Sequence, residues 1–190
     1  MILIIDCGST KVPEIFNLVD NFDECEIVKM EELKTIDTKK YDGVIISGAP
    51  ILLTEVENEP FLEKFQWIKS FAKPILGICF GHQILGLLYG AEVARQHADR
   101  DWNLIGKLNV DEPLFAKLPL DFEMMEDHCE NVSIPPKFIH LAGSDTCVNE
   151  AMRHPEKNFY GIQFHPEVSG NAGAIIFDNF VRICLEKKVN

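Results

Sequence analysis

Cys79 is the residue whose type and surroundings most readily support chemistry. It follows a short apolar run, residues 74–78, whose length is typical of one buried strand, and it precedes a helical pattern over 83–89 that Gly90 can end. A nucleophile at a sharp strand-to-helix turn has the geometry of a nucleophile elbow. The start of the helix carries partial positive charge, which favours the thiolate that attacks carbonyl groups. A lone cysteine is more often a small buried hydrophobe, so Cys79 needs support from elsewhere in the chain.

A second stretch, residues 160–168, supplies the partners that a cysteine nucleophile needs. A base must take the proton of the thiol, and a third group must hold the ring of that base. Pro166 restricts His165 to an extended conformation, and residues two apart in extended chain face the same way. We therefore expect Glu167 to lie beside the imidazole of His165. Only the fold can bring His165 to Cys79, and together the three residues predict a Cys-His-Glu triad.

The elements that would position these residues alternate between strand and helix in the first half of the chain. An unalternated apolar run opens it, as expected for a strand buried on both faces of a parallel sheet. Strands are predicted at 2–5, 26–28, 43–47 and 74–78. One helix is predicted after the first strand, with Ile15, Phe16, Val19 and Phe22 on its apolar face. A second helix is predicted over 58–72, with Asn58 as N-cap and Pro60 in its first turn. This rhythm predicts a doubly wound α/β fold.

The pattern changes after Gly90. Shorter strands are predicted at 104–110, 122–125 and 138–142, and they indicate an antiparallel region beside the mostly parallel sheet. The chain then returns to the main sheet at 159–164 and ends in a helix over about 174–187. We predict a single domain over residues 1–190.

Composition excludes several classes of protein. The 190 residues are 46% hydrophobic and 25% charged, as in ordinary globular proteins, and the net charge of −12 disfavours nucleic-acid binding. No apolar run approaches the roughly 20 residues of a membrane helix, and the opening run is too short for a signal peptide. The six cysteines include no C-x-x-C pair, so no metal site is expected. A reducing cytoplasm fits best.

The two chemical segments resemble those of a known family, the class I (triad-type) glutamine amidotransferases. Residues 77–83, Gly-Ile-Cys-Phe-Gly-His-Gln, resemble its cysteine elbow, and residues 164–168, Phe-His-Pro-Glu-Val, resemble its His/Glu segment. The resemblance extends from 2–6 to 179–180 and implies a flavodoxin-like sheet. Within the family the chain is most similar to the glutaminase part of GMP synthase, especially the stand-alone small subunit, through residues 114–119 and 144–152.

The resemblance implies roles for further residues. Backbone N–H groups of Gly48 and Phe80 would form the oxyanion hole that stabilises the tetrahedral intermediate. The family usually has two glycines before the proline here, where this chain has Gly48-Ala49-Pro50. Gln83 and the segment that contains Asp127 and His128 would bind the amino-acid end of the substrate. No cofactor is implied.

The chain departs from GMP-synthase relatives in two places. Residues 8–11 are Gly-Ser-Thr-Lys where those members carry Gly-(Gly/Ser)-Gln-Tyr, and residues 127–130 are Asp-His-Cys-Glu where they carry Ser-His-Gly-Asp. If Asp127 faces the α-carboxylate of glutamine, two like charges repel each other and weaken binding. We expect this weakening, since Cys129 also replaces a glycine and would stiffen the same turn.

The resemblance implies a glutaminase that releases ammonia for a separate ATP-dependent synthetase subunit, with xanthosine monophosphate as acceptor in the GMP-synthase case. The sequence has no phosphate-binding loop of the G-x-x-x-x-G-K-[S/T] kind. Two alternatives remain open: a free-standing hydrolase of another γ-glutamyl amide, and a catalytically idle regulatory or binding subunit. The intact triad argues against the second.

Overall fold

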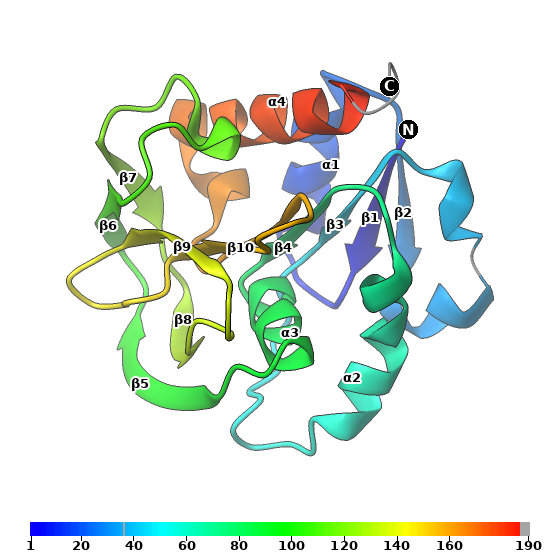
Figure 1. The fold of residues 1–190 in the computed structure, drawn as a ribbon, viewed down its shortest axis with the longest axis horizontal. Helices are drawn as coiled ribbons and strands as arrows, with labels where there is room; N and C mark the ends of the chain where they lie inside the picture. Colours follow the sequence, from blue (N-terminus) through cyan, green and yellow to red (C-terminus); the bar gives the residue numbers. More distant parts are fainter. Residues whose placement is uncertain (36, 187–190) are drawn as a thin grey trace.

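The computed structural model describes residues 1–35 and 37–186, and one large mixed sheet forms the centre of this part of the chain (Figure 1). Five parallel strands make up one side of the sheet and four antiparallel strands extend it. In spatial order the strands are β2 (Cys25–Lys29), β1 (Ile2–Asp6), β3 (Gly43–Ile46), β4 (Ile75–Ile78) and β11 (Phe159–Ile162), then β10 (Ala151–Arg153), β9 (Ile139–Gly143), β6 (Trp102–Lys107) and β7 (Asp121–Met125).

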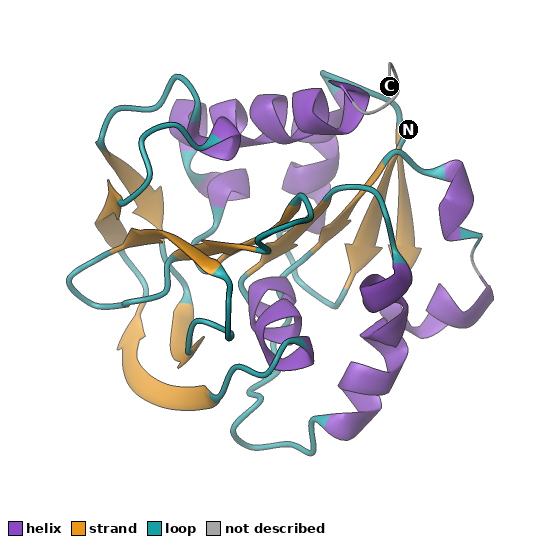
Figure 2. Cartoon of the chain, in the orientation of Figure 1, coloured by secondary structure: helices purple, strands orange, loops and turns teal. Residues whose placement is uncertain are grey.

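Helices cover both faces of this sheet, and a small second sheet stands beside it (Figure 2). Helices α1 (Val12–Asp20) and α4 (Gly170–Glu186) pack together on one face, and α2 (Glu59–Phe65) and α3 (Phe80–Leu88) pack on the other. The second sheet pairs β5 (Val93–Asp99) with β8 (His128–Val132), antiparallel. Short 3₁₀ helices complete the described elements: η1 (Met30–Thr35), η2 (Thr38–Lys40), η3 (Gln66–Ser70), η4 (Pro113–Phe115) and η5 (Pro166–Val168).

The apolar run in β1 shows why the sheet needs helices on both sides. Alternate side chains of a strand point to opposite faces, so Ile2 and Ile4 contact the core under α1 and α4, whereas Leu3 and Ile5 contact the core under α2 and α3. All four side chains are fully buried. The predicted doubly wound α/β class, with an antiparallel region, is confirmed.

Several predicted boundaries were wrong. The helix predicted over 58–72 is α2 followed by the 3₁₀ helix η3, and Asn58 occupies its N-cap position without a side-chain capping bond. Phe22 lies beyond α1 and is 40% exposed, because the helix ends two residues earlier. The last helix begins at Gly170, four residues before the predicted start, and its predicted end at residue 187 lies outside the described residues. Strands β5, β8 and β10 were not predicted.

The turn from β4 into α3 is tight because two glycines face each other across it. A Cβ on Gly77 would lie 2.5 Å from the backbone of Gly81, and a Cβ on Gly81 would lie 2.4 Å from the carbonyl oxygen of Ile46. Both distances are below any real Cβ contact. The glycines therefore let α3 start directly against β3 and β4, with Cys79 at the corner.

The carboxyl ends of β1, β3, β4 and β11 lie at one edge of the sheet. In open α/β sheets this edge is where ligands bind. It carries Gly8 after β1, Gly48 after β3, Cys79 after β4 and His165 after β11. Within residues 1–35 and 37–186, none of the helices combines the length and the apolar character needed to span a bilayer.

Candidate active site

Cys79 sits in a backbone conformation that few side chains adopt. Its φ is 50° and its ψ is −103°, a strained combination for a residue with a side chain. Two backbone hydrogen bonds hold it there: its N–H donates to the carbonyl of Ile162 at 2.8 Å, and its carbonyl accepts from the N–H of Gln83 at 3.0 Å. The sharp strand-to-helix turn predicted from the sequence is confirmed, and Cys79 is 8% exposed.

The backbone of His165 is fixed from two sides. Its N–H donates to the carbonyl of Met125 at 2.9 Å, and its carbonyl accepts from the Ser169 hydroxyl at 2.6 Å. The same hydroxyl accepts a bond from the N–H of Met125 at 2.9 Å. These bonds join the end of β11 to the end of β7, so the position of the imidazole does not depend on the loop alone.

Glu167 orients the imidazole of His165, as expected, but by a different backbone route. The distance from Nδ1 of His165 to Oε1 of Glu167 is 2.7 Å, and both side chains are buried. Glu167 lies in the 3₁₀ turn η5 and not in extended chain. The contact was therefore predicted correctly, whereas the extended geometry invoked for it was wrong, since Pro166 begins a tight turn directly after His165.

Cys79 and His165 are neighbours in space, although they lie far apart in the sequence. Both border Gly48, where an added Cβ would lie 3.3 Å from Cε1 of His165 and 3.6 Å from Cβ of Cys79. Burial disfavours the imidazolium, but hydrogen bonding to Cys79 and to Glu167 outweighs it and raises the pKa of His165 to about 10. The buried Nε2 of His165 meets the distance and angle criteria for a hydrogen bond with none of the described residues. The arrangement favours a protonated imidazole close to Cys79.

Gly48 and Phe80, the predicted oxyanion donors, both line the cavity beside Cys79. Phe80 is the first residue of α3, where the N–H groups of a helix lack an intrahelical acceptor. Gly48 follows β3, and its carbonyl accepts a bond from the hydroxyl of Ser47 at 2.9 Å. Ala49 is not among the residues with positive φ, so alanine fits where relatives usually carry glycine. Their role as oxyanion donors stays a prediction.

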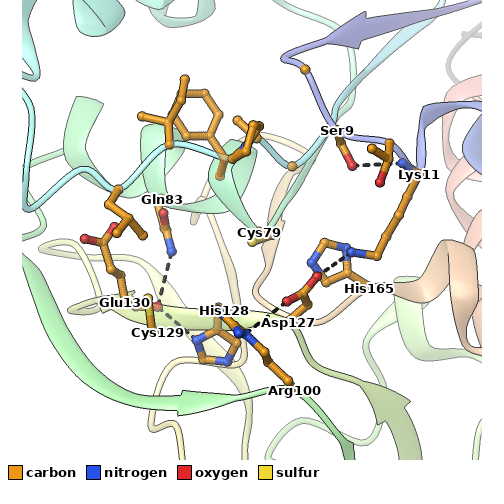
Figure 3. A pocket seen from close by; sticks show the side chains of 18 of the residues that line it. Ser9, Lys11, Cys79, Gln83, Arg100, Asp127, His128, Cys129, Glu130 and His165 are labelled. Carbon is orange, nitrogen blue, oxygen red and sulfur yellow. Dashed lines mark hydrogen bonds and ion pairs between the residues drawn. The ribbon is translucent and has the colours of Figure 1, made fainter.

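A cavity of about 450 Å³ opens onto the thiol (Figure 3). Its walls come from the loops after β1 and β3, the start of α3, the β5–β6 connection and the segment that opens β8. The lining residues are Gly8, Ser9, Thr10, Lys11, Gly48, Ala49, Pro50, Ile51, Leu52, Cys79, Phe80, Gln83, Arg95, Arg100, Asp127, His128, Cys129, Glu130 and His165. The cavity thus gathers every residue that the sequence assigned to catalysis or binding, with the exception of Glu167, which lies behind His165.

Gln83 and His128 lie deeper than a simple substrate contact requires. The amide nitrogen of Gln83 lies 3.2 Å from both the carbonyl of Glu130 and Oε1 of Gln163, so it already has protein partners. His128 lines the cavity, but only 2% of its side chain is exposed and its Nε2 lies 3.1 Å from Oε2 of Glu126. A role for either residue in substrate binding stays a prediction.

The two segments that depart from the GMP-synthase pattern meet at the rim of the cavity (Figure 3). The ammonium of Lys11 lies 2.7 Å from Asp127, and the guanidinium of Arg100 lies 3.6 Å from it. Partial burial opposes ionisation of Asp127, but the bond to Lys11 lowers its pKa. Two cations therefore offset the charge of Asp127, and the expected weakening of glutamine binding stays a prediction. Cys129 lies in the extended strand β8 and not in a turn, so its stiffening effect is absent as well.

Sequence reasoning missed the two arginines and the glutamate that shape this wall. Arg95 and Arg100 reach the cavity from β5 and the turn after it, a strand that was not predicted. The carboxylate of Glu130 accepts bonds from the backbone N–H groups of Leu53 and Thr54, at 2.8 and 3.0 Å, and so ties the loop after β3 to β8. The apolar and polar residues of β5 alternate too irregularly to signal a strand.

The family comparison agrees with this geometry. Residues 3–183 match the model of glutamine amidotransferase class-I. The chain therefore belongs to the class I glutamine amidotransferase family.

Relatives within the family are more specific. The chain is 39% identical to the A subunit of the glutamine-hydrolyzing GMP synthase of Pyrococcus furiosus, over 98% of this chain and 100% of that one. It is 35% identical to the protein of the same name from Methanocaldococcus jannaschii, over 97% of each chain. A solved structure of a putative GMP synthase A subunit from Thermoplasma acidophilum has a TM-score of 0.89 at 27% identity, over 99% and 95% of the two chains. A glutamine amidotransferase from Thermotoga maritima shares the fold, with a TM-score of 0.72 at 22% identity over 100% and 85%.

Proposed function

We propose that this chain is the glutaminase subunit of a two-subunit GMP synthase. It hydrolyses the side-chain amide of glutamine, and the ammonia passes to a separate ATP-dependent synthetase subunit. The observation that supports the chemistry most directly is the strained Cys79 corner beside the buried His165–Glu167 pair, at the floor of one cavity. The relatives named as the A subunit of GMP synthase support the choice of acceptor.

In the first half-reaction the Cys79 thiolate attacks the side-chain carbonyl carbon of glutamine. The carbonyl π electrons move to oxygen, and the N–H groups of Phe80 and Gly48 stabilise this oxyanion. The imidazolium of His165, whose pKa is raised to about 10, then donates its proton to the departing nitrogen. The C–N bond breaks, ammonia leaves, and a γ-glutamyl thioester remains on Cys79.

In the second half-reaction water hydrolyses this thioester. The imidazole of His165, now neutral, accepts a proton from the attacking water and returns to the imidazolium form. The C–S bond breaks, glutamate leaves, and the Cys79 thiolate is restored. Glu167 holds the ring through its 2.7 Å contact with Nδ1 and leaves Nε2 free to face the reacting atoms.

The cations at the rim of the cavity suit the amino-acid end of the substrate. Glutamine carries an α-carboxylate and an α-ammonium group. The rim carries Asp127 between Lys11 and Arg100, and Arg95, which pairs with Glu55, lies on the same cavity. A rim with charges of both signs can pair with both groups of the amino acid. A free-standing γ-glutamyl hydrolase is the alternative, because this rim differs from the pattern in GMP-synthase relatives.

The test is to measure ammonia release and nucleotide formation together. The purified chain is mixed with the synthetase subunit from the same genome, xanthosine monophosphate, ATP, Mg²⁺ and glutamine. We expect glutamine-dependent GMP formation that is lost in Cys79→Ala and retained in Cys25→Ser, whose cysteine lies on the distant edge strand β2. Hydrolysis of other γ-glutamyl amides at full rate, without stimulation by the synthetase, would favour the free-standing hydrolase.

A further inference from the structure

A cluster of buried polar side chains lies behind the cavity wall and plays no part in the triad. It consists of Glu126 just before β8, His128 at the start of β8, and Cys147 and Glu150 in the loop between β9 and β10. One ligand atom each from His128, Cys147 and Glu150 lie within 4.8 Å of one another. Glu126 adjoins the group, since its carboxylate lies 3.1 Å from Nε2 of His128. We infer that these four side chains form a Zn²⁺ site.

The first argument is that the cluster contains polar atoms that no protein group satisfies. Glu126 is 1% exposed and Glu150 is fully buried. Oε1 of Glu126 and Oε2 of Glu150 have no hydrogen-bond partner among the described residues, and Oε2 of Glu126 and Nε2 of His128 have only their mutual 3.1 Å contact. Buried polar atoms are nearly always paired, and two carboxylates that face each other require either protons or a cation. A divalent cation held by one oxygen of each carboxylate, the imidazole and the Cys147 sulfur would balance the charge of both carboxylates.

The second argument is the orientation of the histidine. Nδ1 of His128 lies 2.9 Å from the carbonyl oxygen of Glu130 and 3.0 Å from the amide nitrogen of Gln96. In the tautomer with its proton on Nδ1, His128 donates to the carbonyl of Glu130, which can only accept, and the lone pair of Nε2 faces the cluster; the opposite tautomer would accept from the Gln96 amide and leave the Glu130 carbonyl without this donor. Histidines that bind metals commonly donate their other ring N–H to a backbone carbonyl in this way.

The third argument is the organisation of the loop that carries the other ligands. The hydroxyl of Ser144 donates to Oε1 of Glu150 at 2.6 Å and accepts from the N–H groups of Thr146 and Cys147, at 3.2 and 3.0 Å. One hydroxyl thus fixes the backbone at Cys147 and occupies the outer oxygen of Glu150. The inner oxygen, Oε2, and the thiol are left for the cluster.

The donor set selects the metal. A thiolate, an imidazole and carboxylates together suit Zn²⁺, whereas Mg²⁺ and Ca²⁺ prefer oxygen alone. Zinc bonds of about 2.0–2.3 Å place tetrahedral ligands about 3.5 Å apart, so the three atoms now within 4.8 Å need move only about 1 Å. The spacing in sequence carried no signal because the ligands come from two separate segments and contain one cysteine. Bound zinc would fix β8, and with it the cavity wall at residues 127–130, to the β9–β10 loop.

Metal binding to the reduced full-length chain tests the proposal. The metal-free protein is titrated with Zn²⁺ against a chromophoric chelator, bound zinc is counted by mass spectrometry, and Co²⁺ is used as a spectroscopic probe. We expect one zinc per chain, a thiolate-to-cobalt charge-transfer band and a higher melting temperature with zinc. Ser144→Ala removes a residue that only hydrogen-bonds a ligand, and it should weaken zinc affinity by roughly 10–100-fold. Cys147→Ser removes a ligand, so it should weaken zinc affinity by more than this and should lose the charge-transfer band.

Two controls separate this site from the triad. Cys79→Ala removes the catalytic thiol, and Cys184→Ser removes an equally buried thiol on α4; both should bind one zinc with unchanged affinity. Glu150→Gln, which keeps size and shape, decides the question if Cys147→Ser fails to fold by circular dichroism. Failure of the wild type to bind zinc or to give the cobalt band overturns the proposal in favour of a protonated carboxyl pair. Binding that persists in Cys147→Ser and Glu150→Gln, or that disappears in Cys79→Ala, also overturns it. None of these outcomes bears on glutamine hydrolysis.

Discussion

The Lys11–Asp127 ion pair predicts how charge at the cavity rim controls glutamine binding. Lys11→Met removes the ammonium that lies 2.7 Å from Asp127 and leaves Arg100, at 3.6 Å, as the remaining ion-pair partner among the described residues, with His165 acting more weakly. Where the α-carboxylate of glutamine faces Asp127, the KM for glutamine should rise. Asp127→Ser should lower it, because the cations of the rim then lack an internal anion. The double variant should return to within about threefold of the wild type, because the two charge changes oppose each other.

The size of the effect follows from distance and exposure. Two unit charges 4 Å apart interact by about 1 kcal/mol in bulk water and by about 4 kcal/mol at an effective dielectric constant near 20. The Asp127 side chain is 45% exposed and that of Lys11 is 23% exposed, so the lower value applies. A change of about 1 kcal/mol corresponds to roughly a fivefold change in KM. Acylation involves other residues, so kcat should stay constant.

Initial rates of ammonia release over a range of glutamine concentrations measure this effect. The matched control is Lys39→Met, which makes the same charge change on the exposed helix η2, away from the cavity. Raising the ionic strength should reduce the difference between Lys11→Met and wild type, because exposed charges are screened. A lower KM in Lys11→Met would refute the reasoning, since it would mean that the α-ammonium group faces Asp127. Equal KM values in the wild type, Lys11→Met, Asp127→Ser and the double variant would mean that the Lys11–Asp127 pair lies outside the glutamine-binding site.

The remaining predictions concern the triad, its protonation, the partner and the elbow. Cys79→Ala and His165→Ala should each reduce ammonia release by at least about a thousandfold. Glu167→Ala should retain roughly ten- to a hundredfold more activity than either, because the Glu167 carboxylate only orients the imidazole ring. Substantial turnover in Cys79→Ala would exclude Cys79 as the nucleophile. The pKa of His165 is raised to about 10, so its contribution to the free energy of unfolding should be complete below about pH 6.5 and lost as pH rises to about 10. A His165 NMR titration should show this pKa, and it should fall in Cys79→Ala; an unchanged value would remove Cys79 as a cause. The isolated chain should hydrolyse glutamine slowly, and the synthetase should raise the rate in a steady-state assay. Full activity without the synthetase, unchanged when it is added, would mean that the chain acts alone. Gly81→Ala should lower the free energy of unfolding by about 1–3 kcal/mol in urea denaturation, because the new Cβ would lie 2.4 Å from the Ile46 carbonyl oxygen. Gly106→Ala is the control: its Cβ would have no atom nearer than 3.4 Å, so the free energy of unfolding should change little.

The parallel strands of the central sheet, the corner at Cys79 and the contact of His165 with Glu167 could be predicted because their signals are local. The strand before Cys79 is a short apolar run, and the glycines beside it admit only a tight turn. The pairing of His165 with Glu167 follows from their nearness in sequence, although its 3₁₀ geometry did not follow. The position of Cys79 beside His165 required the resemblance to a known family, because no local pattern specifies that contact.

The wall of the cavity could not be predicted in the same way. Strand β5 has an irregular burial pattern, and β8 follows β7 after two residues without a glycine or proline to mark the turn. The ion pair between Lys11 and Asp127 joins residues 116 positions apart, so a charge that looked isolated in the sequence is balanced in the fold. The same holds for the buried cluster around Cys147, whose members come from both sides of the β9 strand.

Covalent labelling with 6-diazo-5-oxo-L-norleucine, an electrophilic analogue of glutamine, tests the central claim most directly. The intact mass of the protein is measured before and after incubation, and the modified peptide is sequenced by mass spectrometry. A working glutaminase site predicts one adduct per chain, located on Cys79, with formation slowed by excess glutamine and absent in Cys79→Ala. An unlabelled protein, or an adduct on Cys7, Cys129 or another thiol that forms equally in Cys79→Ala, would contradict the claim that this cavity binds glutamine and that Cys79 is its nucleophile.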